Sequence, residues 1–391
     1  MKESFPEGKS DLFAAFIQRC TGLASKRGLS AMITMQSWMF LSSFEKLRRS
    51  LLCNQWIVSM LHLGTRAFDS IGGEVVSSTA FVIENVPPSR RGTASTRCGS
   101  FVRIVDGKSE AEKIVMLDRA RHTREARDGF HGASPEDFTV IPGSPIVYWL
   151  SEKMRTTFKE GRSLGEMAEL LVGLRTGDNT RFLRFWWEVA QDRTTLDCTS
   201  LAEAKASGRR WFPYNKGGSF RRWYGNHEYV VNWENDGREI EEGLAERYPY
   251  MVPAGQSVLR GQGRSRYFSP SVSWSDISSG EAAFRRYPGG FIHDSTGHSG
   301  FGEPSTLDRV AILMNSTFAA QALQVLAPTM HFHIGYVGQV PVASDVERLC
   351  TERMDKLVER SKRDWDEYET SWDFRSNPLV TIGHQDAFEL R

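Results

Sequence analysis

Cysteine is scarce in this chain of 391 residues. Its five cysteines are widely separated and form no Cys-x-x-Cys pair: Cys20, Cys53, Cys98, Cys198 and Cys350. The odd count and the wide spacing argue against a disulfide framework and against a structural zinc site. We therefore expect the protein to reside in a reducing compartment, the cytoplasm.

Long apolar runs are missing as well. Stretches such as residues 31–35 are far shorter than the ~20 apolar residues of a membrane-spanning helix. Residues 1–8 contain no apolar segment of the kind found in a secretion signal. The sequence therefore predicts a protein that neither crosses a membrane nor is exported.

An excess of one charge is absent too. The formal net charge is +1, so contact with nucleic acid would have to come from a local basic patch. With 40% hydrophobic and 25% charged residues, the composition is that of an ordinary globular protein. The length predicts two or three domains.

Several catalytic motifs do not occur in the sequence. We find no Gly-x-x-x-x-Gly-Lys loop for phosphates, no Gly-x-Ser-x-Gly nucleophile turn and no His-Glu-x-x-His helix. The pair His331 and His333 would place two rings on one side of a strand, but no acidic or cysteine cluster accompanies it, nor His293 or His298. We therefore predict no metal site and disfavour a hydrolase or a nucleoside-triphosphate enzyme.

The first part of the chain alternates helical and strand patterns, which predicts an α/β domain. The expected elements are a helix over 11–24, strands over 29–35, 56–63 and 75–83, and a helix near 44–51. The strand over 29–35 is nearly continuous in apolar residues, which is typical of a strand buried on both faces. In the helix near 44–51, Lys46, Arg48 and Arg49 are expected to face water.

This α/β pattern begins on a helix. A nucleotide-binding sheet normally opens with a strand and a glycine-rich turn, because the ligand lies at the carboxyl ends of the first strands. The order here therefore predicts the second half of a doubly wound, Rossmann-like sheet without its first half.

The residue pattern of the sequence changes after about residue 145. Six of the eleven tryptophans lie within 186–274, among short β-like segments. Here a basic stretch with interleaved aromatics has no acidic residue between 204 and 227; its cations are Lys205, Arg209, Arg210, Lys216, Arg221 and Arg222. Such a stretch fits phosphate neutralisation and base stacking, but also a solvated loop whose aromatics turn into the core.

A second candidate is the glycine-bounded turn 173–179. Arg175, Thr176 and Asn179 at its tip are residue types that read purine edges or hold phosphate. A glycine turn before an apolar stretch is also a common connection between structural elements. A DNA contact and a purely structural turn therefore both stay open as interpretations.

From Lys9 onward the chain resembles the adenine-specific DNA methyltransferases of bacteriophage exclusion (BREX) systems, the PglX family, which are similar to Type IIG restriction-modification enzymes. The strings that carry the resemblance are rich in rare residues: Lys9-Ser10-Asp11-Leu12-Phe13, Met35-Gln36-Ser37-Trp38-Met39-Phe40, Met60-Leu61-His62-Leu63-Gly64, Ile141-Pro142-Gly143-Ser144-Pro145, Trp211-Phe212-Pro213-Tyr214-Asn215-Lys216, and stretches near 68–79, 173–183, 223–237, 274–280 and 365–374.

The resemblance implies a domain that binds S-adenosylmethionine and methylates a flipped adenine in double-stranded DNA. The two motifs that perform this work in the family, a glycine-containing cofactor turn and an Asn-Pro-Pro-Tyr segment, do not occur here. We therefore expect the C-terminal portion of such an enzyme, inactive alone and without catalytic residues of its own. Asp11, Leu12 and Phe13 correspond to a stretch that lines the cofactor pocket in relatives, although Phe13 fits equally a helix packed into the core.

The resemblance also implies DNA contacts by Arg175, Thr176, Asn179, Lys216, Arg221, Arg222 and Trp223. We expect three parts: a partial methyltransferase domain over 1–145, a mixed α/β target-recognition domain over 146–345 and a helical tail over 346–391. The expected partners are DNA, an upstream methyltransferase fragment and other phage-defence proteins. Two rival interpretations are a DNA specificity module without chemistry and a Type IIG enzyme that also cleaves DNA.

Overall fold

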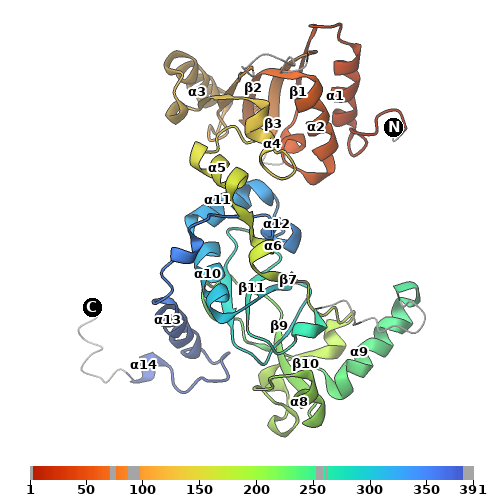
Figure 1. Ribbon diagram of the computed structural model, residues 1–391, viewed down its shortest axis with the longest axis vertical. Coiled ribbons are helices and arrows are strands. Elements are labelled where there is room, and N and C mark those ends of the chain that lie inside the picture. Colours follow the sequence, from red (N-terminus) through yellow and green to blue (C-terminus); the bar gives the residue numbers. More distant parts are fainter. Residues whose placement is uncertain (1–2, 71–75, 87–96, 252–258, 260–262, 382–391) are drawn as a thin grey trace. The chain divides into compact units, whose positions relative to one another are not determined.

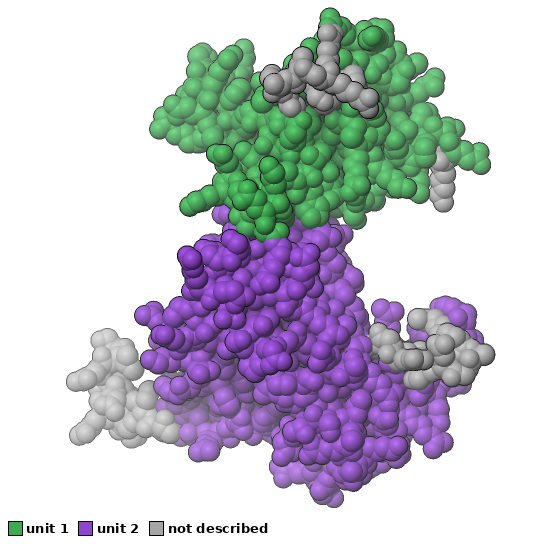
Figure 2. Space-filling model, in the orientation of Figure 1, with its two compact units in different colours: residues 1–161 green, residues 162–391 purple. Residues whose placement is uncertain are grey.

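The structure, a computed structural model, describes residues 3–70, 76–86, 97–251, 259 and 263–381. It is mixed α/β with several sheets, as the sequence pattern predicted. The chain divides into two compact units, residues 1–161 and 162–391, whereas the sequence placed the first boundary at 145/146 (Figure 2). Within the described residues, no helix has the length and apolar character needed to cross a membrane.

The first unit is built around one sheet of five strands. Its elements in chain order are α1 (Leu12–Leu23), β1 (Leu29–Met35), α2 (Glu45–Asn54), β2 (Trp56–Gly64), β3 (Ser78–Glu84), β4 (Gly99–Arg103), α3 (Glu110–Thr123), β5 (Phe130–Ala133), α4 (Pro135–Thr139) and α5 (Glu152–Glu160). The strand order is β1-β3-β2-β4-β5. Only β2 and β4 are parallel, and the other neighbours are antiparallel.

The main core of this unit lies on the face of the sheet that α1 and α2 cover (Figure 1). Leu47 and Leu51 of α2 are buried there together with Phe81 of β3, so the apolar spacing of the helix did predict its inner face. A smaller cluster lies under α3 on the opposite face, around Val102 and Ile104.

Strand β1 contradicts the expectation of burial on both faces. It is an edge strand, and its odd-numbered residues are exposed, with Leu29 65% and Ile33 61% accessible. Thr34 on the other face is buried, and Met32 packs against the main core. The expectation was wrong because an apolar run shows only that neither face of the strand carries a charged side chain. It does not show that the first unit covers both faces.

Arg48 is the second correction in this unit. It was expected to face water but is 1% exposed, and its guanidinium donates hydrogen bonds to four backbone carbonyls. These belong to Trp38 and Leu41 on one side and to Gly143 and Ser144 on the other, at 2.7–3.2 Å. Burial lowers the pKa of Arg48 to about 10. The planar fork of the guanidinium suits this arrangement, since it offers donors in several directions.

The second unit contains two sheets of four strands and one of two. Its elements are β6 (Arg162–Ser163), α6 (Leu164–Met167), β7 (Glu169–Leu171), α7 (Asn179–Phe182), β8 (Leu183–Phe185), α8 (Leu201–Ala206), β9 (Trp211–Asn215), β10 (Tyr229–Asn232), α9 (Glu234–Arg247), β11 (Ser271–Ser275), β12 (Phe284–Tyr287), β13 (Ile292–His293), β14 (Gly297–Phe301), α10 (Pro304–Met314), α11 (Thr317–Leu326), α12 (Ile334–Val337), β15 (Pro341–Val342), α13 (Met354–Asp366) and α14 (Pro378–Thr381). The sheet orders are β13-β9-β10-β8, β12-β11-β14-β7 and β15-β6.

The segment 292–301 links the two larger sheets, because β13 joins one of them and β14 the other. Apolar residues recur at helical spacing over 306–326, which predicts a helix there, and the structure divides this segment into α10 and α11. Asn315 lies at the split and hydrogen-bonds through its amide to both the N–H and the carbonyl of Phe284. This pairing holds α10 against β12.

Candidate nucleic-acid interface

The turn 173–179 is anchored on the segment 292–301. Leu174 donates its N–H to the carbonyl of His293 at 2.6 Å, and a side chain at Gly173 would clash with that same carbonyl. Thr176 is 3% exposed and its hydroxyl donates to Oδ1 of Asn179 at 2.6 Å. The structure thus brings Thr176 and Asn179 together, and Arg175 between the anchors is exposed.

Asp294 is the buried acid to which this turn and Lys216 are both connected. The hydroxyl of Tyr214 lies 2.7 Å from Oδ2 of Asp294 and 3.0 Å from the carbonyl oxygen of Leu174. The ammonium of Lys216 lies 3.0 Å from the same Oδ2. Burial, followed by the charge of Asp294, raises the pKa of Tyr214 well above its ordinary value. Tyr214 therefore stays protonated and donates a hydrogen bond.

Arg221 and Arg222 are also paired with carboxylates. Arg221 lies 2.9 Å from Asp364 of α13, and its guanidinium lies over the ring of Trp365 at 4.9 Å. Arg222 lies 2.9 Å from Glu281. The three cations predicted as phosphate contacts therefore each have an acidic partner that is distant in sequence. Among the described residues, two cations of this stretch make no ion pair: Lys205, which is exposed, and Arg209, which is half-buried.

Most of the interleaved aromatics turn into the core. Trp211, Phe212, Tyr214 and Tyr224 are at most 8% exposed, whereas Phe220 is 55% exposed. For these four aromatics the alternative of a loop packed on the core is the one that the structure supports. Phe220, over which Arg222 lies at 5.4 Å, remains available for stacking.

Trp223 has a strained backbone. Its φ is 75°, a left-handed conformation that costs a bulky residue ~1–2 kcal/mol. Its N–H and carbonyl both pair with the β12 strand, through Phe284 and Arg286. Asn226 also has positive φ, at 63°, as do three glycines of this loop. The loop 216–226 is thus held in one shape by its surroundings, as segments at functional sites often are.

In the first unit, Asp11, Leu12 and Phe13 do not converge on a shared pocket. Asp11 precedes α1 without accepting a side-chain capping bond, and Leu12 is 61% exposed. Phe13 packs inward on Phe44, with ring centroids 5.5 Å apart. These three side chains form no cradle for a cofactor among the residues that the structure describes.

A polar cluster that sequence reasoning missed lies at the end of β1 and β2. His62 is buried, with Nε2 at 2.7 Å from the side-chain oxygen of Gln36 and Nδ1 at 3.1 Å from the hydroxyl of Tyr148. Burial first, and then the charge of Arg103, lowers the pKa of His62 to about 3. The imidazole is therefore neutral at physiological pH. Gln36 and His62 both lie in strings that carry the family resemblance, and this was the available signal.

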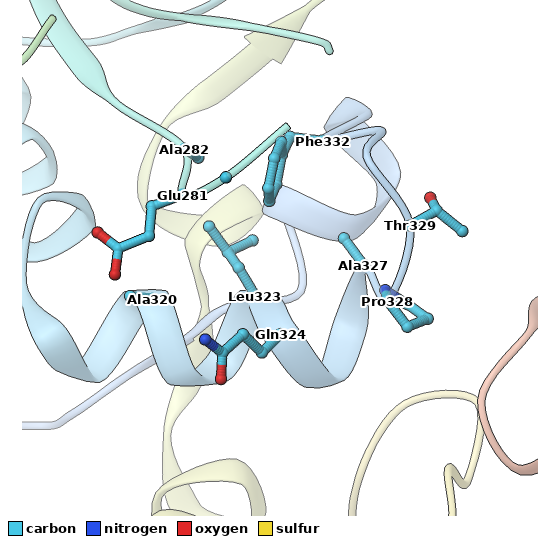
Figure 3. Close-up of a pocket in the computed structure, with 10 residues that line it drawn as sticks. Glu281, Ala282, Ala320, Leu323, Gln324, Ala327, Pro328, Thr329 and Phe332 are labelled. Atoms are coloured by element: carbon cyan, nitrogen blue, oxygen red, sulfur yellow. The ribbon is translucent and has the colours of Figure 1, made fainter. Parts of the chain in front are cut away.

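The second unit also contains a cavity of about 370 Å³ beside α11. Figure 3 shows Leu323 pointing toward Phe332, with Glu281 to one side. The apolar lining fits packing rather than catalysis. Elsewhere, Asp276 lies 3.3 Å from both His298 and His331, but in the described ranges no group of three or more His, Cys, Asp or Glu could hold a metal.

Comparison with known proteins identifies relatives over nearly the whole chain. The adenine-specific methyltransferase PglX of Lacticaseibacillus casei (strain Zhang) is 37% identical over 380 residues, which covers 96% of this chain and 30% of that protein. The adenine-specific methyltransferase BrxX of Escherichia coli O9:H4 (strain HS) is 37% identical over 385 residues, covering 97% and 29%. The resemblance to the PglX family is therefore confirmed, and this chain spans about 30% of the length of these curated relatives.

Two further comparisons concern a family model, which matches a shorter segment of the chain, and a solved structure. The family model of the Eco57I restriction-modification methylase matches residues 1–68. The structure of the Type IIL restriction-modification enzyme MmeI in complex with DNA aligns with 96% of this chain and 47% of that one, with a TM-score of 0.47 and 9% identity.

Proposed function

We propose that this chain is part of a site-specific DNA adenine methyltransferase of a phage-defence system, of the BREX type. The observation that carries the proposal is the 37% identity to PglX over 96% of the chain. Residues 1–145 would be the second half of a Rossmann-like methyltransferase sheet, residues 146–345 the target-recognition domain and residues 346–391 a helical tail. S-adenosylmethionine is the cofactor that such an enzyme uses. Asp11, Leu12 and Phe13 are the residues of this chain that would border its pocket, and we assign them no step.

The recognition role is supported by the arrangement of the second unit. A turn held rigidly at Leu174 and Thr176 presents Arg175 and Asn179 at its tip, which suits reading of base edges. The loop 216–226 has a fixed backbone shape and carries cations together with one exposed aromatic residue, Phe220. The rival function, a specificity module without chemistry, uses the same surface. One outcome distinguishes the two functions. Only a part of the enzyme should support methyl transfer when the other half of the methyltransferase domain is supplied.

Binding of the full chain to duplex DNA tests the recognition role. The affinity should fall as salt rises between about 50 and 200 mM, because neutralised phosphates release counterions. Arg222→Glu should weaken binding to all sequences and flatten the salt dependence. Arg238→Glu on α9 makes the same change of charge at a side chain that is 73% exposed, and should leave both unchanged.

Ion pairing requires one further control. Arg222→Glu places two carboxylates together, so the double variant Arg222→Glu/Glu281→Arg restores the pair with the charges exchanged. The same exchange at Arg221 and Asp364 examines the second pair. If the exchanged variants bind DNA as the wild type does, these arginines hold the fold and do not contact phosphates.

Base reading is tested at the turn. Asn179→Ala should change the preference among DNA sequences by ~1–3 kcal/mol for a lost base contact. Thr176→Val removes the same internal hydrogen bond and leaves the amide of Asn179 in place, so it should keep the preference. Equal effects of the two substitutions would reduce the turn to a structural element.

A further inference from the structure

Phe220 is the aromatic residue of the loop 216–226 that is most exposed to solvent. Its side chain is 55% exposed, whereas Trp223 is half-buried and Tyr224 is 7% exposed. The two residues before it, Gly218 and Ser219, are exposed and too small to cover the ring. A single exposed apolar side chain is common on protein surfaces, but this one is held in a fixed position.

The backbone is anchored on both sides of Phe220. Before the ring, the carbonyl oxygens of Gly218 and Ser219 accept hydrogen bonds from the side chains of Ser275 and Asn226, each at 2.9 Å. After the ring, Trp223 pairs through its N–H and its carbonyl with β12. A ring on so rigid a backbone loses little conformational entropy when it contacts a partner. This is the preorganisation expected of a residue that binds another molecule.

Arg222 supplies a positive charge next to the ring. Its guanidinium lies over the ring of Phe220, 5.4 Å from the centroid, and is held by Glu281 at 2.9 Å. A protein partner would require a contiguous apolar patch, but the neighbours of Phe220 in the chain are glycine, serine and arginine. An aromatic ring beside a cation instead suits nucleic acid, because the ring stacks on bases while the cation attracts phosphates.

We infer that Phe220 is a wedge that enters duplex DNA between two successive base pairs and unstacks them. The inference rests on the proposed function, and it adds a contact that hydrogen bonds to base edges do not supply. Unstacking is easiest at pyrimidine–purine steps, so the wedge favours sequences that have such a step at one position. Phe220 thereby contributes to sequence preference through the deformability of DNA.

Untwisting of DNA by the full chain tests the wedge, because a ring inserted between base pairs lowers the twist at that step. The substrate is a nicked plasmid with tandem copies of a duplex that the chain selects from a random pool. Ligation of the nick with the chain bound, followed by removal of the protein, converts the untwisting into a lower linking number. The wild type should lower the linking number in proportion to the amount of chain bound. Phe220→Ala should abolish this change and weaken binding by about 5- to 150-fold, the loss expected for one stacked base.

Two further variants separate the role of the ring from effects on the fold. Phe220→Tyr keeps a flat ring and should keep both the untwisting and the affinity. Trp187→Ala is the matched control, since Trp187 is 46% exposed, lies outside the loop and has one ring face covered by Phe185 at 4.6 Å. It should change neither quantity. Both positions are exposed, and equal melting temperatures would show that the variants fold.

Three results would overturn the wedge. They are a wild type that binds DNA without lowering the linking number, an undiminished change of linking number with Phe220→Ala, and an equal loss with Trp187→Ala. Each of these, with salt-dependent DNA binding by the wild type intact, would reject the wedge and keep the recognition role. A wild-type chain that does not bind DNA at all would reject the recognition role and the wedge together.

Discussion

Replacing Arg48 with methionine tests whether a buried guanidinium holds the first unit together. The side chain is 1% exposed and donates to four carbonyls from two segments, near residues 38–41 and 143–144. Methionine fills much of the same volume but offers no donor. The carbonyls of Trp38, Leu41, Gly143 and Ser144 would then lose their common partner.

A buried carbonyl left without a donor costs ~1–3 kcal/mol. Four such groups would suggest more, but two effects reduce the sum. The buried cation itself is desolvated, as its pKa of about 10 indicates, so its removal relieves a penalty. Gly143 is also only half-buried, so water can replace the donor that its carbonyl loses. We therefore expect Arg48→Met to lower the free energy of unfolding of the first unit by ~3 kcal/mol.

Arg49→Met is the matched control. Arg49 is the neighbouring residue of α2, its side chain is 64% exposed and it makes an i,i+4 ion pair with Glu45 at 2.8 Å. Loss of such a surface pair changes stability by less than ~0.5 kcal/mol. Urea denaturation, read by hydrogen exchange on peptides from 1–161, isolates the first unit. If the two variants differ by less than ~1 kcal/mol, the four hydrogen bonds contribute little net stability and the reasoning is refuted.

Two further predictions concern the buried His227 and the cofactor. Burial lowers the pKa of His227 from 6.5 to about 3, and the ring packs among aromatics such as Tyr224 and Trp372. The unfolded chain therefore binds a proton at this histidine below about pH 6.5, whereas the folded chain does not bind it until about pH 3. The free energy of unfolding therefore falls as the pH drops through this window. His227→Phe should reduce that slope by up to ~1.4 kcal/mol per pH unit, whereas His331→Phe, at a side chain 56% exposed, should not; equal slopes would contradict the assignment. Calorimetry of the full chain with S-adenosylmethionine should show no binding, because the cofactor turn and the Asn-Pro-Pro-Tyr segment are absent from the sequence; micromolar affinity at one site per chain would show that other residues form the pocket.

Local pattern predicted the elements of the first unit well. The expected strand over 29–35 is β1, and the expected helix over 11–24 is α1, Leu12–Leu23. These succeeded because apolar spacing and turn residues act over a few positions. The helix expected over 306–326 was broken by Asn315, whose partner Phe284 lies 31 residues away.

The side-chain environments were less predictable for the same physical reason. Arg48 bonds to carbonyls 95 and 96 residues away, and Lys216, Arg222 and Arg221 pair with acids 78, 59 and 143 residues away. No local pattern distinguishes a cation with such a partner from one in water. The candidate residues could therefore be named from the sequence, but their pairing required the tertiary structure.

The turn 173–179 separates positions that must stay constant from positions that can vary. Gly173 and Leu174 fix the backbone to His293, and Thr176 is buried behind the tip. Arg175 lies between these fixed points and is exposed. Variants of this turn should therefore change 175 and keep 173, 174, 176 and 179, because Asn179 accepts the hydrogen bond of Thr176. If this turn reads bases as we propose, variation at 175 would change the DNA preference while the anchors hold the backbone.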